Sequence, residues 1–234
     1  MGCMEADSLV TIGTHMVSAL SMNVIIDALC SHARDHFENA KYSHDWEHTV
    51  RVYKLCMHIG AIEGADLDIL AISAYLHDIG RPFQDISKGD ICHAEKGAEM
   101  ARELLEKYPI PDEKKENIIG CILSHRYRNS HVPQTIEAKV LFDADKLDAI
   151  GAVGLARAYL FAGEVGALLH NPDAKPEQTK PYSRDDTGYR EYRVKLSKIK
   201  DKMLTLEGSR LAQGRHDFME VFFERFHKEH EGLL

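Results

Sequence analysis

Apolar residues recur along most of this chain at the three- and four-residue spacing of an α-helix, and the alternating pattern of a β-strand is nearly absent. Capping residues, glycines and prolines mark where the helices begin and end. The pattern predicts helices after Asp45, from Asp66 or Asp68 to a stop at Gly80 and Pro82, from His93 to Tyr108, from Asp112 through Leu123, from Ala144 to Phe161, and over roughly 189–206 and 210–229. We therefore expect an all-α fold.

The segment 170–188 differs from its neighbours, because three prolines lie among Lys, Asp, Thr and Ser residues. We expect a mobile loop there, and the sequence leaves open whether it covers a site or is a surface excursion. No internal repeat is present, so we expect one domain over 1–234. Its parts would be a core at about 25–165, this loop, and C-terminal helices over 189–231, the last of which buries Phe218, Val221, Phe222 and Phe226.

Composition and charge narrow the function classes. The 234 residues are 44% apolar and 28% charged, as in ordinary globular proteins, and the net charge of -8 argues against a general nucleic-acid binder. A small phosphorylated substrate is still compatible with that charge, because a metal and a few basic residues can reverse its sign locally. No run reaches the length of a membrane span and no basic leader is seen, so we expect a cytoplasmic protein. The five scattered cysteines indicate free thiols.

Two polar residues, His77 and Asp78, follow the apolar run from Leu70 to Leu76. Burying an imidazole and a carboxylate is costly unless a partner satisfies both groups, and a bound metal ion would do so. Neighbouring side chains on a helix point about 100° apart, so the ion would lie beside the helix, between the two directions.

Further ligand candidates stand in apolar surroundings elsewhere in the chain. His48 shares a helix face with His44, and Asp145 lies in the run Phe142-Asp-Ala-Asp145-Lys. Together with His77 and Asp78 they make two imidazoles and two carboxylates, a set that suits Mn, Fe, Ni, Mg or Zn. We expect His48 and Asp145 to reach the ion from facing helices of a bundle.

The order of these residues resembles that in the HD-domain metal-dependent phosphohydrolases, and in particular one subgroup of small bacterial and archaeal HD hydrolases. The resemblance covers roughly residues 25–230. It is carried by His44-Asp-x-x-His48-x-x-Arg51-Val52, His77-Asp-Ile-Gly80, Asp143-Ala-Asp145-Lys-Leu-Asp-Ala-Ile-Gly151 and Arg215-His216-x-Phe218-Met219. It implies a helical HD-domain bundle with the metal in its core, and it places Asp145 rather than Asp143 among the ligands. We interpret Asp143 as an N-cap and Asp148 as a complement to a helix start.

The resemblance extends to residues around the ion. His93 and His125 correspond to histidines that bind a second ion in some HD proteins and contact substrate phosphate in others; both could equally be helix-end residues. Arg51 and Lys146 could neutralise phosphate charge or be exposed helix charges. Some HD nucleotidases carry a water-activating Glu at the position where this chain has Arg81.

These observations favour a metal-dependent hydrolase of a phosphoester or phosphoanhydride, with a nucleotide as the expected substrate. Asp78, His93, His125, Arg51 and Lys146 are the expected catalytic residues. Two alternatives stay open. A di-iron oxygenase of the HD fold would use the six residues His48, His77, Asp78, His93, His125 and Asp145. A nucleotide or metal sensor would bind without turnover. The oligomeric state is open as well, with a homo-oligomer among the alternatives.

Overall fold

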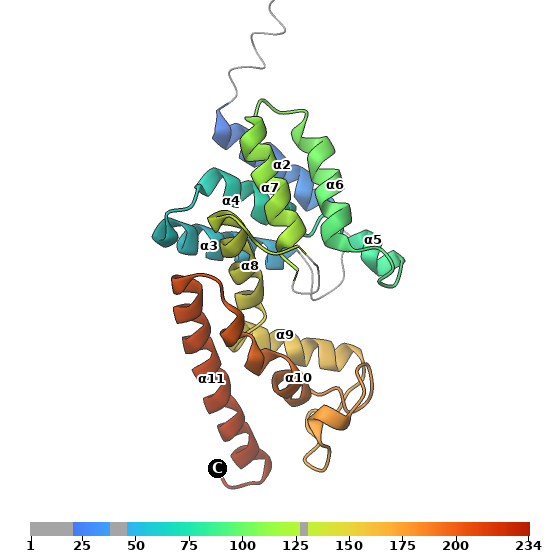
Figure 1. Cartoon of the computed structure of the whole chain (residues 1–234). Coiled ribbons are helices and arrows are strands. Elements are labelled where there is room, and N and C mark those ends of the chain that lie inside the picture. The colour runs from blue at the N-terminus through green and yellow to red at the C-terminus, as the bar shows by residue number, and fades with distance from the viewer. Residues whose placement is uncertain (1–20, 38–45, 127–130) are drawn as a thin grey trace, which may run out of the picture.

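The computed structural model describes residues 21–37, 46–126 and 131–234, and every regular element in these ranges is a helix. The all-α prediction is confirmed. The upper part of Figure 1 holds α2 (Met22–Asp35), α3 (Trp46–Glu63), α4 (Leu67–Leu76), α5 (Arg81–Ile86), α6 (His93–Leu105) and α7 (Asp112–Ser124). From there α8 (Ile136–Asp148) leads down to α9 (Gly151–Glu164), α10 (Gly188–Val194) and α11 (Leu206–His230).

Helix α4 lies at the centre of the upper part, where it packs against α2, α3, α7 and α8. Its N-cap is Asp66, whose side chain accepts hydrogen bonds from the backbone N–H groups of Asp68 (3.0 Å) and Ile69 (3.2 Å). The helix ends at Leu76, and Pro82 lies in the first turn of α5 rather than in the predicted stop. Although α4 is almost wholly apolar, no described helix is long and apolar enough to span a membrane. Its burial on all sides puts the residues that follow it inside the bundle.

The single helix predicted from Ala144 to Phe161 is wrong, because the chain forms two helices that meet at residues 149–150. Gly151 has φ +76°, a conformation that residues with a Cβ rarely adopt, and the side chain of Arg215 packs against the space that a Cβ would occupy. The apolar spacing continues through this turn, so periodicity alone could not reveal it. The first of the two helices, α8, also begins earlier than predicted, at the N-cap Thr135.

The C-terminal helices are confirmed only in part. In place of one helix over 189–206, α10 is followed by two short 3-10 segments, Leu196–Lys198 and Lys200–Lys202. Leu196 and Ile199 are both buried, and a 3-10 turn puts residues three apart on one side. Helix α11 buries Ala212, His216, Met219 and Phe223, whereas Phe218 and Val221, which we expected inside, are 46% and 65% exposed.

The segment 170–188 is tied to the start of α10. Arg190 donates to the Thr179 hydroxyl (2.6 Å) and to the Asp186 carboxylate (2.8 Å), and a 3-10 turn forms at Pro176–Gln178. The mobility of this segment stays a prediction.

Candidate metal centre

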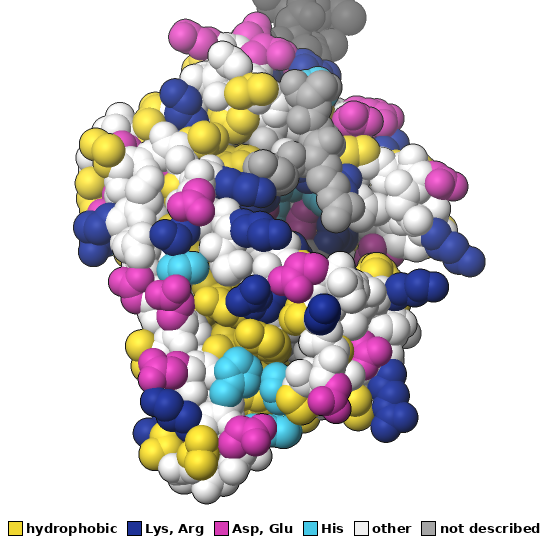
Figure 2. Space-filling view, turned by 60° about the horizontal axis from the view of Figure 1, so that its bottom comes forward, with side chains coloured by type: hydrophobic (Ala, Val, Ile, Leu, Met, Phe, Trp, Pro, Cys, Tyr) yellow, Lys and Arg dark blue, Asp and Glu magenta, His cyan; other side chains and the backbone are white. Residues whose placement is uncertain are grey.

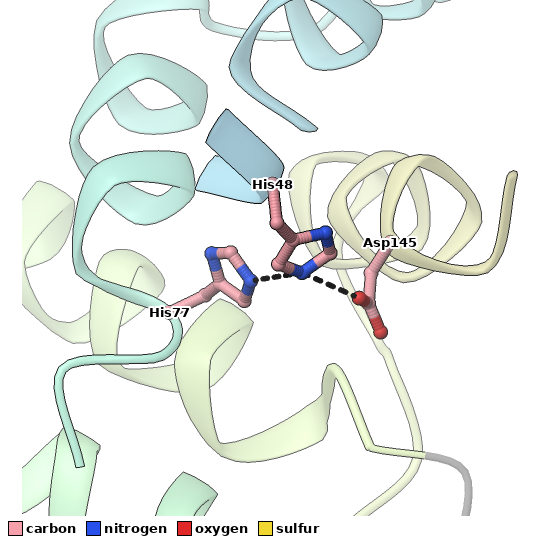
Figure 3. A group of neighbouring side chains, drawn as sticks. All are labelled: His48, His77 and Asp145. Atoms are coloured by element: carbon pink, nitrogen blue, oxygen red, sulfur yellow. Dashed lines mark hydrogen bonds and ion pairs between the residues drawn. The ribbon is translucent and has the colours of Figure 1, made fainter. Parts of the chain in front are cut away.

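Three of the predicted ligands meet where α3, α4 and α8 converge (Figure 3). His48 lies in the first turn of α3, His77 directly follows α4, and Asp145 lies near the end of α8. His48 Nε2 is 3.4 Å from His77 Nε2 and 3.4 Å from Asp145 Oδ1. His48 and Asp145 lie 97 positions apart in the sequence, yet the fold brings them together. Imidazole nitrogens and carboxylate oxygens are atoms of the kind that bind metal ions in proteins.

A second group lies beside the first and consists of Asp78, His93 and His125. His93 Nε2 is 3.1 Å from both Asp78 Oδ1 and His125 Nε2. The other carboxylate oxygen of Asp78, Oδ2, is 3.8 Å from His77 Nε2 and 3.9 Å from His48 Nε2. Asp78 therefore lies between the two groups and faces each with one oxygen.

A close approach of two backbones positions the second group. A Cβ on Gly80 would lie 2.3 Å from the carbonyl oxygen of His93 and 2.5 Å from the nitrogen of Gly97. Only glycine fits there, so the turn after α4 touches the first turn of α6 directly. His93, the first residue of α6, consequently lies next to Asp78.

Hydrogen bonds on the outer side of three histidines fix their orientation. The Nδ1 atoms of His48, His77 and His125 face Asp148 Oδ2 (2.8 Å), the carbonyl of Ala74 (2.7 Å) and the carbonyl of Ile122 (2.6 Å). All three partners are acceptors, so each Nδ1 carries a proton, and Nε2 is the nitrogen that can offer a lone pair to a cation. This is the arrangement that a divalent cation requires of imidazole ligands.

The charge balance of the site also fits a cation. Burial alone would raise the pKa of Asp78 and Asp145, but the histidines around Asp78, and Lys146 and His48 beside Asp145, hold both pKa values well below the usual range, so both carboxylates are ionised. Burial lowers the pKa of His77 to about 4 and that of His93 to about 2. Burial opposes the charge on His48 too, but Asp145, Asp148 and Asp78 outweigh it and raise its pKa to about 9. A proton on His48 thus supplies the positive charge that these carboxylates need, and a metal ion can replace it.

Asp148 was interpreted as a complement to a helix start, and this is wrong. It is the last residue of α8 and is buried, and besides His48 it binds two arginines. Arg51 Nε and Arg157 NH1 each donate to its carboxylate at 2.6 Å. The spacing of Asp145 and Asp148, three residues apart on one helix face, was the signal in the sequence that both point to one place.

Asp143 is not an N-cap of its own helix either, because it lies in the middle of α8. Its carboxylate faces the start of α11 and accepts hydrogen bonds from the backbone N–H groups of Leu204 (2.9 Å) and Thr205 (2.8 Å) and from the Thr205 hydroxyl (2.7 Å). Asp143 therefore joins α8 to α11 and points away from the metal centre.

Replacing Asp143 by alanine should lower the free energy of unfolding and leave the metal content unchanged. Three donors, of which the two on Thr205 are buried, would lose their acceptor, and one such loss at a buried donor costs about 1–3 kcal/mol. Denaturant unfolding and metal analysis of the same preparation check both parts. Asp143→Asn keeps one acceptor oxygen, so its free energy of unfolding should lie between those of the wild type and Asp143→Ala. Loss of the metal in either variant would contradict the placement of Asp143 outside the metal centre.

The two predicted phosphate contacts lie at the edge of the centre and already have carboxylate partners. Lys146 Nζ is 2.6 Å from Asp145 Oδ2 and 3.0 Å from the carbonyl of His125, and Arg51 binds Asp148. Figure 2 shows Lys and Arg side chains grouped around a hollow that contains His and acidic side chains. His44 and the N-cap candidate Asp45 lie outside the described residues.

Comparisons with known proteins agree with this geometry. The HD domain family model matches residues 45–150. The uncharacterized protein YpgQ of Bacillus subtilis (strain 168) is 33% identical over 194 residues, which are 81% of this chain and 86% of YpgQ. A crystal structure of an HD-superfamily hydrolase from Bacillus thuringiensis superposes with a TM-score of 0.73 at 28% identity, covering 90% of this chain and 99% of that one. The crystal structure of YpgQ in complex with ADP superposes with a TM-score of 0.69 at 30% identity, and the match covers 90% of this chain and 97% of the YpgQ chain.

Proposed function

This chain belongs to the HD-domain family, and from that premise we propose that it is a metal-dependent phosphohydrolase whose substrate is a nucleotide. The observation that carries the proposal is the convergence of three oriented imidazoles and two ionised carboxylates inside the bundle. We assign the ion to His48, His77, Asp78 and Asp145, with Mn, Fe, Ni, Mg and Zn as the candidate metals.

The residues around that position suit phosphoryl chemistry. A divalent cation held there would supply Lewis-acid activation of water and of a phosphoryl oxygen. His93 and His125 lie on the far side of Asp78 and present ring nitrogens toward the same space. Arg51 and Lys146 bring positive charge to the edge of the centre, where it would stabilise the charge on a phosphate group.

The choice of a nucleotide is supported by the relative YpgQ, one of whose crystal structures is a complex with ADP. The net charge of -8 does not oppose such a ligand, because the basic residues are local to the centre. A free nucleotide substrate also agrees with an enzyme that acts in the cytoplasm.

The convergence of six side chains is compatible with the di-iron oxygenase alternative as well, because both groups of possible ligands come together. The hydrolase is favoured because the compared structure from Bacillus thuringiensis is an HD-superfamily hydrolase. An oxygenase would consume oxygen, a sensor would bind metal and nucleotide without turnover, and only a hydrolase would release phosphate or pyrophosphate without oxygen.

Chelation should abolish activity, and one of the candidate metals should restore it. The experiment is dialysis against EDTA, metal analysis, and a screen for released phosphate or pyrophosphate over nucleoside mono-, di- and triphosphates, with and without oxygen. We expect turnover that is independent of oxygen and needs an added divalent cation, and Asp143→Asn serves as a metal-retaining control. Oxygen consumption without phosphate release, or nucleotide binding without any product, would overturn the proposal.

A further inference from the structure

We propose that Arg81 holds His93 in the tautomer that carries its proton on Nε2, so that His93 donates a hydrogen bond to the substrate and is not a metal ligand. This inference rests on the proposed function, because it assigns a role within the same centre. Arg81 is then a positioning residue: it acts through His93 and has no contact with the reacting atoms.

The contact between Arg81 and His93 permits only one tautomer. Arg81 NH1 lies 2.9 Å from His93 Nδ1. A guanidinium group has five N–H donors and no acceptor, so this contact is a hydrogen bond only when Nδ1 has no proton. Gln84 Oε1 is also 2.9 Å from Nδ1, but a glutamine amide can turn to present its NH₂ group, whereas arginine has no such alternative.

His93 differs in this respect from the other three histidines of the centre. The Nδ1 atoms of His48, His77 and His125 face a carboxylate or a backbone carbonyl, which hold the proton on Nδ1. These three histidines can therefore offer Nε2, and only Nε2, to a cation. At His93 a cationic donor faces Nδ1 instead, beside the Gln84 amide, which can turn its NH₂ group to the same nitrogen.

The tautomer determines what the second group can bind. With its proton on Nε2, His93 donates to Asp78 Oδ1 or to His125 Nε2, each 3.1 Å away. That proton occupies the direction in which a second ion would need a lone pair, and the charge of Arg81 also opposes a second cation nearby. A phosphoryl oxygen, in contrast, can accept the Nε2 proton. One ion at His48, His77, Asp78 and Asp145 follows from this arrangement.

The backbone fixes where Arg81 stands. Its N–H group donates to the carbonyl of Asp78 at 2.9 Å, and the preceding Gly80 lies against the first turn of α6. Arg81 therefore enters the centre from the turn that carries Asp78, and its side chain reaches the outer nitrogen of His93 rather than the ion.

Metal counting on charge variants tests the proposal. Wild-type protein titrated with Mn²⁺ should bind one ion per chain tightly. Arg81→Glu presents an acceptor to Nδ1, returns the lone pair to Nε2, and should strengthen binding of a second ion at least tenfold. The amide of Arg81→Gln can either donate or accept, so the affinity of this variant for a second ion should lie between those of the wild type and Arg81→Glu.

Arg126 is the matched control, because it separates charge from tautomer. Its guanidinium acts electrostatically on His93, and it donates a hydrogen bond to Cys92 Sγ (3.3 Å) rather than to His93 Nδ1. Arg126→Glu makes the same change of two charge units near the second group as Arg81→Glu does, but presents no acceptor to His93 Nδ1, so it should keep a single ion. A second ion bound in Arg126→Glu as tightly as in Arg81→Glu would overturn the assignment to the tautomer.

Nitrogen-15 NMR of the metal-free protein reads the tautomer directly, with the His93 signals assigned by their loss in His93→Gln. We expect the Nε2-protonated form in the wild type and the Nδ1-protonated form in Arg81→Glu. An Nδ1 proton in the wild type, or two ions bound there with similar affinity, would overturn the inference. The expected tautomer together with no phosphate release from any nucleotide would instead count against the proposed hydrolase and leave the role of Arg81 standing.

Discussion

Replacing His77 by alanine is expected to remove the metal and the hydrolase activity together. His77 is completely buried, its Nδ1 is committed to the carbonyl of Ala74, and its Nε2 faces both His48 and Asp78. No described neighbour can take over that position, because His48 and Asp145 come from other helices and the adjacent Asp78 already faces both groups of possible ligands. The loss in metal affinity should exceed the roughly 10–100-fold that removal of an outer hydrogen-bond partner costs.

Metal analysis after gel filtration and kcat/KM with saturating metal give the two readouts for His77→Ala. Circular dichroism shows whether the bundle persists, and Asp143→Ala provides a control that is destabilised yet keeps its ligands. Full metal retention in His77→Ala would contradict the placement of the ion, and activity that survives loss of the metal would contradict the mechanism.

Asp148→Asn should give the second-largest effect, a loss of metal affinity of roughly 10–100-fold with the ligands all present. The carboxylate accepts from His48 Nδ1 at 2.8 Å and so keeps the Nε2 lone pair directed at the ion. An asparagine can present its NH₂ group to Nδ1 and thereby stabilise the wrong tautomer of His48. The half-buried guanidinium groups of Arg51 and Arg157 would also lose the negative charge of Asp148.

Titration of the metal-free protein with Mn²⁺ measures this loss. Arg157→Gln is the matched control, since it removes one partner of Asp148 but leaves the bond to His48, and its effect on metal affinity should be several-fold smaller. An Asp148→Asn protein that binds Mn²⁺ as tightly as the wild type would show that the hydrogen bond does not orient His48.

The sequence predicted which residues gather at the candidate metal centre better than it predicted the contacts between distant segments. His77 and Asp78 were found because two polar residues in a fully apolar run need a partner, and the structure buries both. His93 and His125, which the resemblance connected with the same chemistry, do lie beside Asp78. For His77 and Asp78 the signal was local, two polar residues at the end of an apolar segment, whereas His93 and His125 were named through the resemblance to the HD-domain hydrolases.

What the sequence could not provide depends on contacts between distant segments. The partner of Asp148 is 100 residues away along the chain, and the spacing from Asp145 within α8 shows that the two carboxylates share a helix face but not that Asp148 binds His48. The contact of Arg81 with His93 depends on a turn that brings two helix starts together at Gly80. The break before Gly151 is set by packing with Arg215 rather than by a loss of apolar spacing.

Helix α8 carries three aspartates. Asp145 and Asp148 contact His48 in the candidate metal centre, and Asp143 accepts hydrogen bonds from the start of α11. The segment matched by the family model ends at residue 150, yet the donors to Asp143 come from residues 204 and 205. A recombination boundary at residue 150 would strand a buried carboxylate in the very helix that presents the ligands. The part of the chain that forms the candidate metal centre and the C-terminal helices are thus expected to be inherited together, and domain shuffling at that junction should be rare.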